Sequence, residues 1–148
     1  MGVLDGLRVV EFEGLGPAPF CGMLLADLGA DVILIERPDG ANVGATAIYR
    51  RGKRSITLDL KTEAGRGAAL KIAANAEALI EGLRPGVMER LGLGPADIRA
   101  LNPKIVYGRL TGWGQSGPLA PAAGHDVNYV SLSGAAWYAG AAGSPPTP

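Results

Sequence analysis

LRVVEF, residues 7–12, decides the fold of this chain together with EGLGPAP, residues 13–19. The first stretch is rich in β-branched and aromatic residues and the second in glycine and proline, so the sequence predicts a strand, a turn and then a helix. Helical spacing predicts one apolar face on that helix, made by Phe20, Met23, Leu24 and Leu28. The apolar run VILI, residues 32–35, is typical of a parallel strand buried on both faces. The chain is therefore predicted to open with a strand–helix–strand unit.

The same alternation continues along the chain. Further strands are predicted at residues 56–60, 78–80 and 105–107, and further helices at residues 63–76, 87–91 and 95–101. Strands that alternate with helices favour an open parallel sheet. We therefore expect an α/β fold, a Rossmann-like parallel sheet with flanking helices, as a single domain over residues 1–148 that ends in coil at residues 140–148.

Charge and cysteine content exclude several classes of protein. The 148 residues hold 14 basic and 14 acidic side chains, so there is no global field to recruit nucleic acid or an anionic membrane surface. Cys21 is the only cysteine, which excludes an intrachain disulfide and a cysteine-based metal site. The longest strongly apolar run, residues 32–35, is too short for a membrane span or a signal peptide. We expect a cytoplasmic protein.

Several basic residues are candidates for binding a phosphorylated ligand. At the end of the second predicted strand, Glu36 is followed by Arg37, and an arginine at this position of a nucleotide-binding fold suits a phosphorylated ribose. The alternative is a surface arginine paired with Glu36. A basic cluster with no acid among its members follows at Arg50, Arg51, Lys53 and Arg54. It is either a solvated face or an anion site that Arg84 and Arg90 extend.

His125 is the only histidine and the candidate general base. An ordinary histidine pKa of about 6.5 suits proton transfer at neutral pH. It follows the glycine-rich stretch at residues 111–118, which comes directly after the fifth predicted strand, and the carboxyl ends of strands carry the ligands in open α/β sheets. Asp126 is a candidate for the same chemistry or a first-turn acid of the helix expected over residues 127–137. A purely structural histidine is the other interpretation.

Six stretches of the chain resemble the family III CoA-transferase superfamily. They are LDGLRVVE (residues 4–11), LADLGADV (25–32), IERP (35–38), KRSITLDLK (53–61), EGLRPGV (81–87) and YGRLTGWGQSGP (107–118). The match runs in order over nearly all of residues 1–140. Within the superfamily, GHDVNY, residues 124–129, is similar to the α-methylacyl-CoA racemase branch.

This resemblance implies the N-terminal, CoA-binding part of a larger fold whose subunits interlock as dimers. It implies CoA contacts at Arg37, Leu58, Asp59, Leu60, Lys61, Gly82, Leu83, Arg84, Arg90, Gly124, Asn128 and Tyr129, and it makes His125 and Asp126 the candidate catalytic residues. The expected ligand is an acyl-CoA substrate, with no further cofactor and no metal. The expected partner is a second copy of the chain or a companion fragment, and neither nucleic acid nor a membrane.

The activity that the resemblance implies is racemisation of 2-methylacyl-CoA thioesters, a reaction of fatty acid metabolism, with His125 serving one face of the α-carbon. Inversion requires a second acid or base on the opposite face. The resemblance places that aspartate in a Gly-Asp-Phe-Gly-Gly type motif that these 148 residues do not contain, so we expect this chain to be inactive alone. Two alternatives stay open: transfer of CoA between carboxylic acids through a carboxylate nucleophile, and a CoA-binding fragment without catalysis.

Overall fold

The computed structural model describes residues 2–39, 47–141 and 143–145. The chain divides into two compact units, Met1–Thr111 and Gly112–Pro148. The single domain expected over residues 1–148 stays a prediction. Within the described residues, no helix is both long and apolar enough to cross a membrane.

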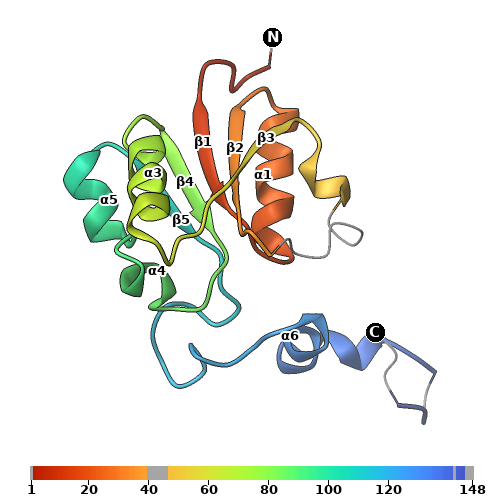
Figure 1. Cartoon of the computed structure of the whole chain (residues 1–148). Coiled ribbons are helices and arrows are strands. Elements are labelled where there is room, and N and C mark those ends of the chain that lie inside the picture. The colour runs from red at the N-terminus through yellow and green to blue at the C-terminus, as the bar shows by residue number, and fades with distance from the viewer. Residues whose placement is uncertain (1, 40–46, 142, 146–148) are drawn as a thin grey trace. The chain divides into compact units, whose positions relative to one another are not determined.

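A five-stranded parallel sheet forms the centre of the first unit (Figure 1). Its strands are β1 (Arg8–Phe12), β2 (Asp31–Glu36), β3 (Lys53–Thr57), β4 (Ala78–Glu81) and β5 (Val106–Arg109). They lie in the order β3-β2-β1-β4-β5, and each neighbouring pair is parallel. The predicted Rossmann-like open sheet is confirmed. Because β1 lies between β2 and the much later β4, its carboxyl end is the topological switch point at which such sheets bind ligands.

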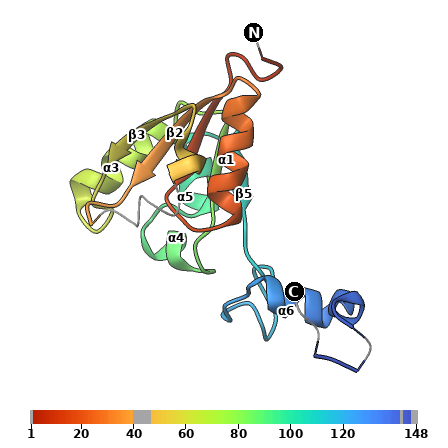
Figure 2. The same ribbon diagram turned by 90° about the vertical axis from the view of Figure 1, so that its right-hand side faces the viewer.

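Helices cover both faces of this sheet (Figure 2). On one face lies α1 (Pro17–Asp27), with the short 3-10 helix η1 (Ala47–Arg50) beside it. On the other face lie α3 (Glu63–Ala73) and α5 (Pro95–Leu101), and the single turn α4 (Val87–Arg90) follows the end of β4. Thr62 caps the start of α3, because its hydroxyl oxygen accepts a hydrogen bond from Gly65 N at 3.1 Å.

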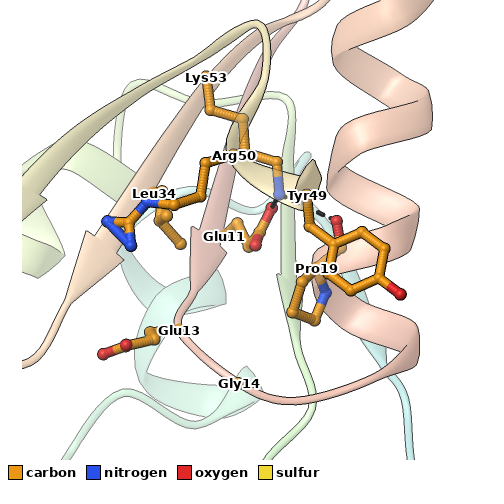
Figure 3. Close-up of a pocket in the computed structure, with 8 residues that line it drawn as sticks. All are labelled: Glu11, Glu13, Gly14, Pro19, Leu34, Tyr49, Arg50 and Lys53. Atoms are coloured by element: carbon orange, nitrogen blue, oxygen red, sulfur yellow. Dashed lines mark hydrogen bonds and ion pairs between the residues drawn. The ribbon is translucent and has the colours of Figure 1, made fainter. Parts of the chain in front are cut away.

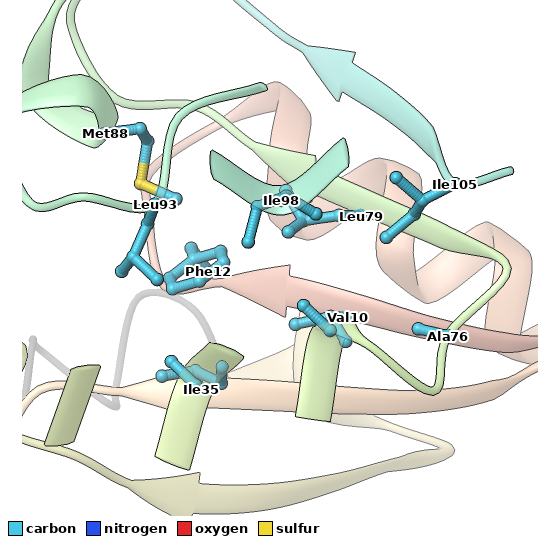
Figure 4. Packing of buried hydrophobic residues seen from close by; sticks show 11 residues of the cluster. Val10, Phe12, Ile35, Ala76, Leu79, Met88, Leu93, Ile98 and Ile105 are labelled. Atoms are coloured by element: carbon cyan, nitrogen blue, oxygen red, sulfur yellow. The ribbon is translucent and has the colours of Figure 1, made fainter. Parts of the chain in front are cut away.

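Two apolar clusters hold these layers together. Successive strand residues point to opposite faces, so Val9 and Val10 of β1 belong to different clusters. The larger cluster packs the sheet against α3 and α5 (Figure 4), and its largest members are Phe12, Ile35, Leu79, Met88, Leu93 and Ile98. The smaller cluster packs the sheet against α1, where Cys21 and Leu25 are half-buried. The core is aliphatic apart from Phe12, as expected from a composition with 5% aromatic residues.

α1 buries a different face from the one that its spacing predicts. Phe20, Leu24 and Leu28 have 47%, 43% and 46% of their surface exposed, and of the predicted face only Met23 is buried. The helix is apolar all round, so spacing alone does not choose between its two faces. Small residues contact the sheet instead, because Gly22 lets the helix backbone approach β1 closely.

Several other elements have different bounds from those predicted. α3 ends at Ala73 rather than at residue 76, and β5 runs over Val106–Arg109 rather than residues 105–107. β3 runs over Lys53–Thr57 rather than residues 56–60, because the chain turns at Asp59, whose Oδ1 accepts a hydrogen bond from Lys61 N at 2.9 Å. In the second unit, the helix expected over residues 127–137 is broken at Gly134, which has a φ of 79°. α6 (Asp126–Leu132) lies before this break and the 3-10 helix η2 (Ala135–Tyr138) after it.

Candidate functional site

A cleft with a volume of about 390 Å³ lies where the strands of the first unit end. We call it the carboxyl-end cleft. It is lined by Phe12, Glu13, Ile35, Glu36, Arg37, Pro38, Asp39, Leu58, Asp59, Leu60, Lys61, Leu83, Val87 and Leu91. These residues come from the ends of β1 and β2, from the turn after β3 and from the segment that runs from the end of β4 through α4 to Leu91. The cleft therefore occupies the switch point of the sheet, where open α/β folds bind their ligands.

Six of the residues that the resemblance assigned to CoA line this cleft: Arg37, Leu58, Asp59, Leu60, Lys61 and Leu83. Three others, Gly82, Arg84 and Arg90, are not part of its described lining, although Gly82 and Arg84 flank Leu83 and Arg90 precedes Leu91. The side chains of Arg84 and Arg90 are exposed. The fold thus brings together residues from three strand ends that are far apart in the sequence, and a CoA contact for each of them stays a prediction.

The cleft combines an apolar floor with a charged rim. Phe12 and Ile35 are buried at its floor. At its rim Arg37 has 64% of its side chain exposed, and its backbone N donates to Glu13 Oε2 at 2.8 Å. The ion-pair partner of Arg37 is also Glu13, not Glu36, because the carboxylate of Glu36 pairs with Arg50. An apolar floor accepts a flat base, and a solvent-accessible guanidinium accepts a phosphate.

Each member of the basic cluster at residues 50–54 pairs with an acid from another part of the chain. The pairs are Arg50–Glu36, Arg51–Asp27, Lys53–Glu11 and Arg54–Asp31. Hydrogen bonds from Arg51 and Arg54 lower the pKa of Asp27 and Asp31, respectively. These cations fasten β3 and η1 to β1, α1 and β2. Arg51 and Arg54 have 51% and 66% of their side chains exposed, so these two belong to a solvated face, and each of the four cations has an acidic partner within the chain.

Lys53 and Glu11 form a buried ion pair beneath α1 (Figure 3). Their side chains are 2% and 1% exposed, and Lys53 Nζ lies 2.6 Å from Glu11 Oε2 and 2.9 Å from the carbonyl oxygen of Pro19. Burial raises the pKa of Glu11 to about 6, against the opposing effect of Lys53. Gly22 lies directly over the carboxylate. A Cβ at position 22 would overlap Glu11 Oε2, so only glycine fits there. The pair therefore sets how closely the start of α1 approaches the sheet.

The candidate catalytic residues belong to the second unit. His125 precedes α6 as its N-cap and Asp126 is the first helical residue, and both side chains are exposed. Asn128 Oδ1 accepts a hydrogen bond from His125 N at 2.9 Å. This contact fixes the backbone from which the imidazole projects.

A tyrosine and a tryptophan tie the glycine-rich stretch to α6. The rings of Trp113 and Tyr129 lie 5.0 Å apart, and Trp113 Nε1 donates to the carbonyl oxygen of Ala123 at 3.3 Å. A Cβ at Gly112 or Gly124 would overlap the hydroxyl of Tyr129. Glycine at both positions is thus required by Tyr129, and the contact helps to place the residues that precede His125.

Sequence reasoning did not single out Glu11, Glu81 or Arg109. Glu11 and Glu81 are buried at 1% and 3% exposure near the ends of β1 and β4. The sequence feature that could have identified both is an acidic residue within or directly after an apolar strand. A carboxylate at such a position is buried by the sheet and requires a partner. Among the described residues, no group of three or more His, Cys, Asp and Glu side chains could hold a metal ion.

Comparison with known proteins places this chain in a family. The alpha-methylacyl-CoA racemase of Mus musculus is 48% identical over 99% of this chain, and the acetyl-CoA:oxalate CoA-transferase of Acetobacter aceti is 37% identical over 99%. The chain spans 38% and 41% of their lengths. The crystal structure of a CaiB/BaiF family protein from Brucella suis superimposes with a TM-score of 0.90 at 35% identity, over 99% of this chain and 43% of that one.

The sequence profile of CoA-transferase family III matches residues 4–148. The resemblance found in the sequence is therefore confirmed, and the fold corresponds to the N-terminal part of the larger family fold. This chain belongs to CoA-transferase family III.

Proposed function

We propose that this chain binds the CoA moiety of an acyl-CoA thioester in the carboxyl-end cleft. The observation that supports the proposal is the convergence of Arg37, residues 58–61 and Leu83 on one cleft at the switch point of the sheet. The apolar floor accepts the adenine ring, and Arg37 and Lys61 at the rim bind phosphate through charge-assisted hydrogen bonds. No cofactor other than the CoA thioester enters the proposal.

The reaction that we propose for the full-length enzyme is racemisation of 2-methylacyl-CoA. His125 takes the α-proton of the thioester, and the electron pair of the C–H bond moves to the carbonyl oxygen as an enolate. A second acid on the opposite face then donates a proton to the α-carbon and inverts it, and His125 passes its proton to solvent. The supporting observations are the exposed imidazole at the start of α6 and the 48% identity to a protein described as a racemase.

Transfer of CoA between carboxylic acids is the second candidate reaction. The acetyl-CoA:oxalate CoA-transferase of Acetobacter aceti matches 99% of this chain. Transfer proceeds through a carboxylate nucleophile that forms a mixed anhydride and releases CoA as a thiolate. In that case His125 has no acid/base role. A CoA-binding fragment without catalysis is the third candidate.

One experiment separates the three candidates. This chain and, in parallel, the full-length enzyme are incubated in D2O with one enantiomer of a 2-methylacyl-CoA and, separately, with acetyl-CoA and a free carboxylic acid. Racemisation gives deuterium at the α-carbon together with the inverted enantiomer. Transfer gives the new thioester without α-deuteration, and a binding fragment gives neither product. Deuteration that His125→Gln leaves unchanged would contradict the role proposed for His125.

We also propose a cytoplasmic enzyme that assembles as a homodimer or with a companion fragment. The balanced charge supports a partner other than nucleic acid or an anionic membrane. The large exposed side chains of α1 support a further polypeptide surface in contact with this chain. Sedimentation of the full-length protein at several concentrations measures the assembly, and a monomer throughout would contradict it.

A further inference from the structure

One wall of the carboxyl-end cleft is the short segment that runs from the end of β4 through α4, and α4 lies between two glycines. Leu83, Val87 and Leu91 line the cleft from this segment, which includes the single turn α4. Gly86 precedes α4 with a φ of 80°, and Gly92 follows it with a φ of 67°. Both values lie in the left-handed region that favours glycine. Four helical residues between two such turns have little stability of their own, so the position of this wall depends on contacts to the rest of the fold.

Glu81 provides the first of these contacts. It ends β4, is 3% exposed, and its Oε2 accepts a hydrogen bond from Leu83 N at 2.7 Å. Its Oε1 lies 3.6 Å from Arg109 Nε. Burial raises the pKa of Glu81, and the Leu83 N–H and the Arg109 charge oppose that shift. The carboxylate thus holds the first residue of the wall that lines the cleft.

Arg109 provides the second contact. It stands opposite Glu81 in the β4–β5 register, and its Nη2 bonds to Glu89 Oε1 on α4. The guanidinium carbon lies 5.5 Å from the centre of the Tyr107 ring, whose hydroxyl donates to the carbonyl oxygen of Leu93 at 2.9 Å. One planar guanidinium therefore joins the ends of two strands to α4, a task that suits arginine better than lysine.

We propose that Glu81, Arg109 and Glu89 form a clamp that positions the α4 wall of the cleft for its ligand. None of the three belongs to the described lining, so they act through Leu83, Val87 and Leu91 as positioning residues. The proposal rests on the proposed function, because it assigns the clamp a role in binding CoA. It does not assign any of the three residues a contact with the ligand.

Glu89→Gln tests the clamp at its exposed end. The variant removes the charge of Glu89, preserves the shape of the side chain and leaves the buried Glu81 unchanged. Two quantities are measured on the whole chain: amide hydrogen exchange of residues 83–93 without ligand, and CoA affinity by calorimetry at low salt. We expect faster exchange confined to this segment and an affinity about fivefold weaker, the scale of one partly exposed ion pair. Glu63→Gln, an exposed acid at the start of α3, is the matched control and should change neither quantity.

Double variants separate positioning of the wall from a general loss of stability. Val87→Ala truncates a lining residue of the wall, and Lys61→Ala truncates one on another strand end. A positioning role predicts that the affinity loss caused by Glu89→Gln shrinks in the Val87→Ala background and persists unchanged in the Lys61→Ala background. Equal additivity in both backgrounds would overturn the proposal.

The clamp and the proposed function fail in different ways. Unchanged exchange in residues 83–93 of Glu89→Gln would overturn the clamp, even if the wild-type chain binds CoA. Faster exchange with no CoA binding by the wild-type chain would overturn the proposed function and, with it, the role of the clamp in binding.

Discussion

At the scale of single residues, the exposed guanidinium of Arg37 is the most direct test of the cleft. Arg37→Ala should weaken CoA binding by about tenfold or more at low salt, because a hydrogen bond to a charged group contributes about 1.5–3 kcal/mol. The loss should shrink as salt is added, since screening weakens the contact. Calorimetry at two salt concentrations measures both effects.

Two further variants accompany Arg37→Ala. Arg99→Ala, on the exposed surface of α5, is the control and should bind CoA like the wild type. Arg90→Ala should also weaken binding if the resemblance places its CoA contact correctly. Wild-type affinity in both Arg37→Ala and Arg90→Ala would refute the CoA assignment.

The buried Glu11 predicts a pH dependence of stability. Its pKa is raised to about 6 in the fold, from an ordinary value of 4.5, so the folded chain holds this proton over a pH range in which the unfolded chain has released it. The contribution of Glu11 to the free energy of unfolding should therefore fall as the pH rises from 4.5 to 6, by about 2 kcal/mol, and stay level above pH 6. Urea unfolding of the wild type and Glu11→Gln across this range isolates the contribution as their difference. A difference that does not change between pH 4.5 and 6.5 would contradict the buried, titrating carboxylate.

The same pair predicts a rescue. At pH 7, Lys53→Met leaves the Glu11 carboxylate buried without its counter-charge and should lower the free energy of unfolding by about 3–5 kcal/mol. Adding Glu11→Gln removes the orphaned charge with a side chain of the same shape. The double variant should recover most of the loss, which urea unfolding at pH 7 measures. A double variant no more stable than Lys53→Met would contradict the orphaned carboxylate as the cause of the loss.

At the scale of elements, replacing a glycine by alanine should have opposite effects on stability in two helices. A Cβ at Gly22 of α1 would overlap the Glu11 carboxylate, whereas a Cβ at Gly67 of α3 would meet no atom within 4 Å. Gly22→Ala should destabilise the chain by about 1–3 kcal/mol through overpacking. Gly67→Ala should stabilise it by about 0.5–1 kcal/mol, because alanine is the better helix former. Chemical denaturation of both variants measures the contrast. Similar effects at the two positions would refute the close packing of α1 against β1 at Gly22.

The elements themselves could be predicted from the sequence, because their signals are local. Pro95 at the start of α5 and the Asn102-Pro103 pair after it bounded that helix at the residues observed. The buried face of α1 could not be predicted, since Phe20 and Gly22 both belong to an apolar helix and only the sheet decides which of them faces inward. The end of β3 was missed because Leu58 and Leu60 continue an alternation after the strand has ended.

Arg37 was predicted from its place at the end of a strand, and the other residues of the cleft only where a family motif carried them. Residues 58–61 and Leu83 entered through the resemblance, and the fold then placed them on one cleft. The pairing of Arg37 with Glu13 instead of Glu36 depends on how two strands end side by side, which a single sequence does not encode locally. Likewise, Arg109 gave no signal of its own, because its partners Glu81 and Glu89 come from another strand and from α4.

At the scale of the whole molecule, the exposed large side chains of α1 predict association. Leu24 and Leu28 stand on one face of the helix with 43% and 46% of their surface exposed, and an uncovered apolar patch favours self-association. The double variant Leu24→Glu/Leu28→Glu should sediment as a smaller species at high concentration, with an unchanged free energy of unfolding. Leu101→Glu, at a leucine of α5 that is 55% exposed, is the control. Equal effects of the two variants on sedimentation would contradict a specific role of the α1 face.

The strand order has a consequence for synthesis. β1 leaves the ribosome first, and its partner in β2 lies close behind, with Arg8 and Asp31 23 residues apart. On its other side, Arg8 and Glu77 are 69 residues apart, so at roughly 5–20 residues per second β1 waits several seconds for β4. During that interval one edge of the future central strand has no partner, and an unpaired edge is a template for pairing with another chain. Slower translation between β2 and β4 would lengthen this interval, so the yield of folded protein should depend on codon choice in that stretch more than in the stretch after β4.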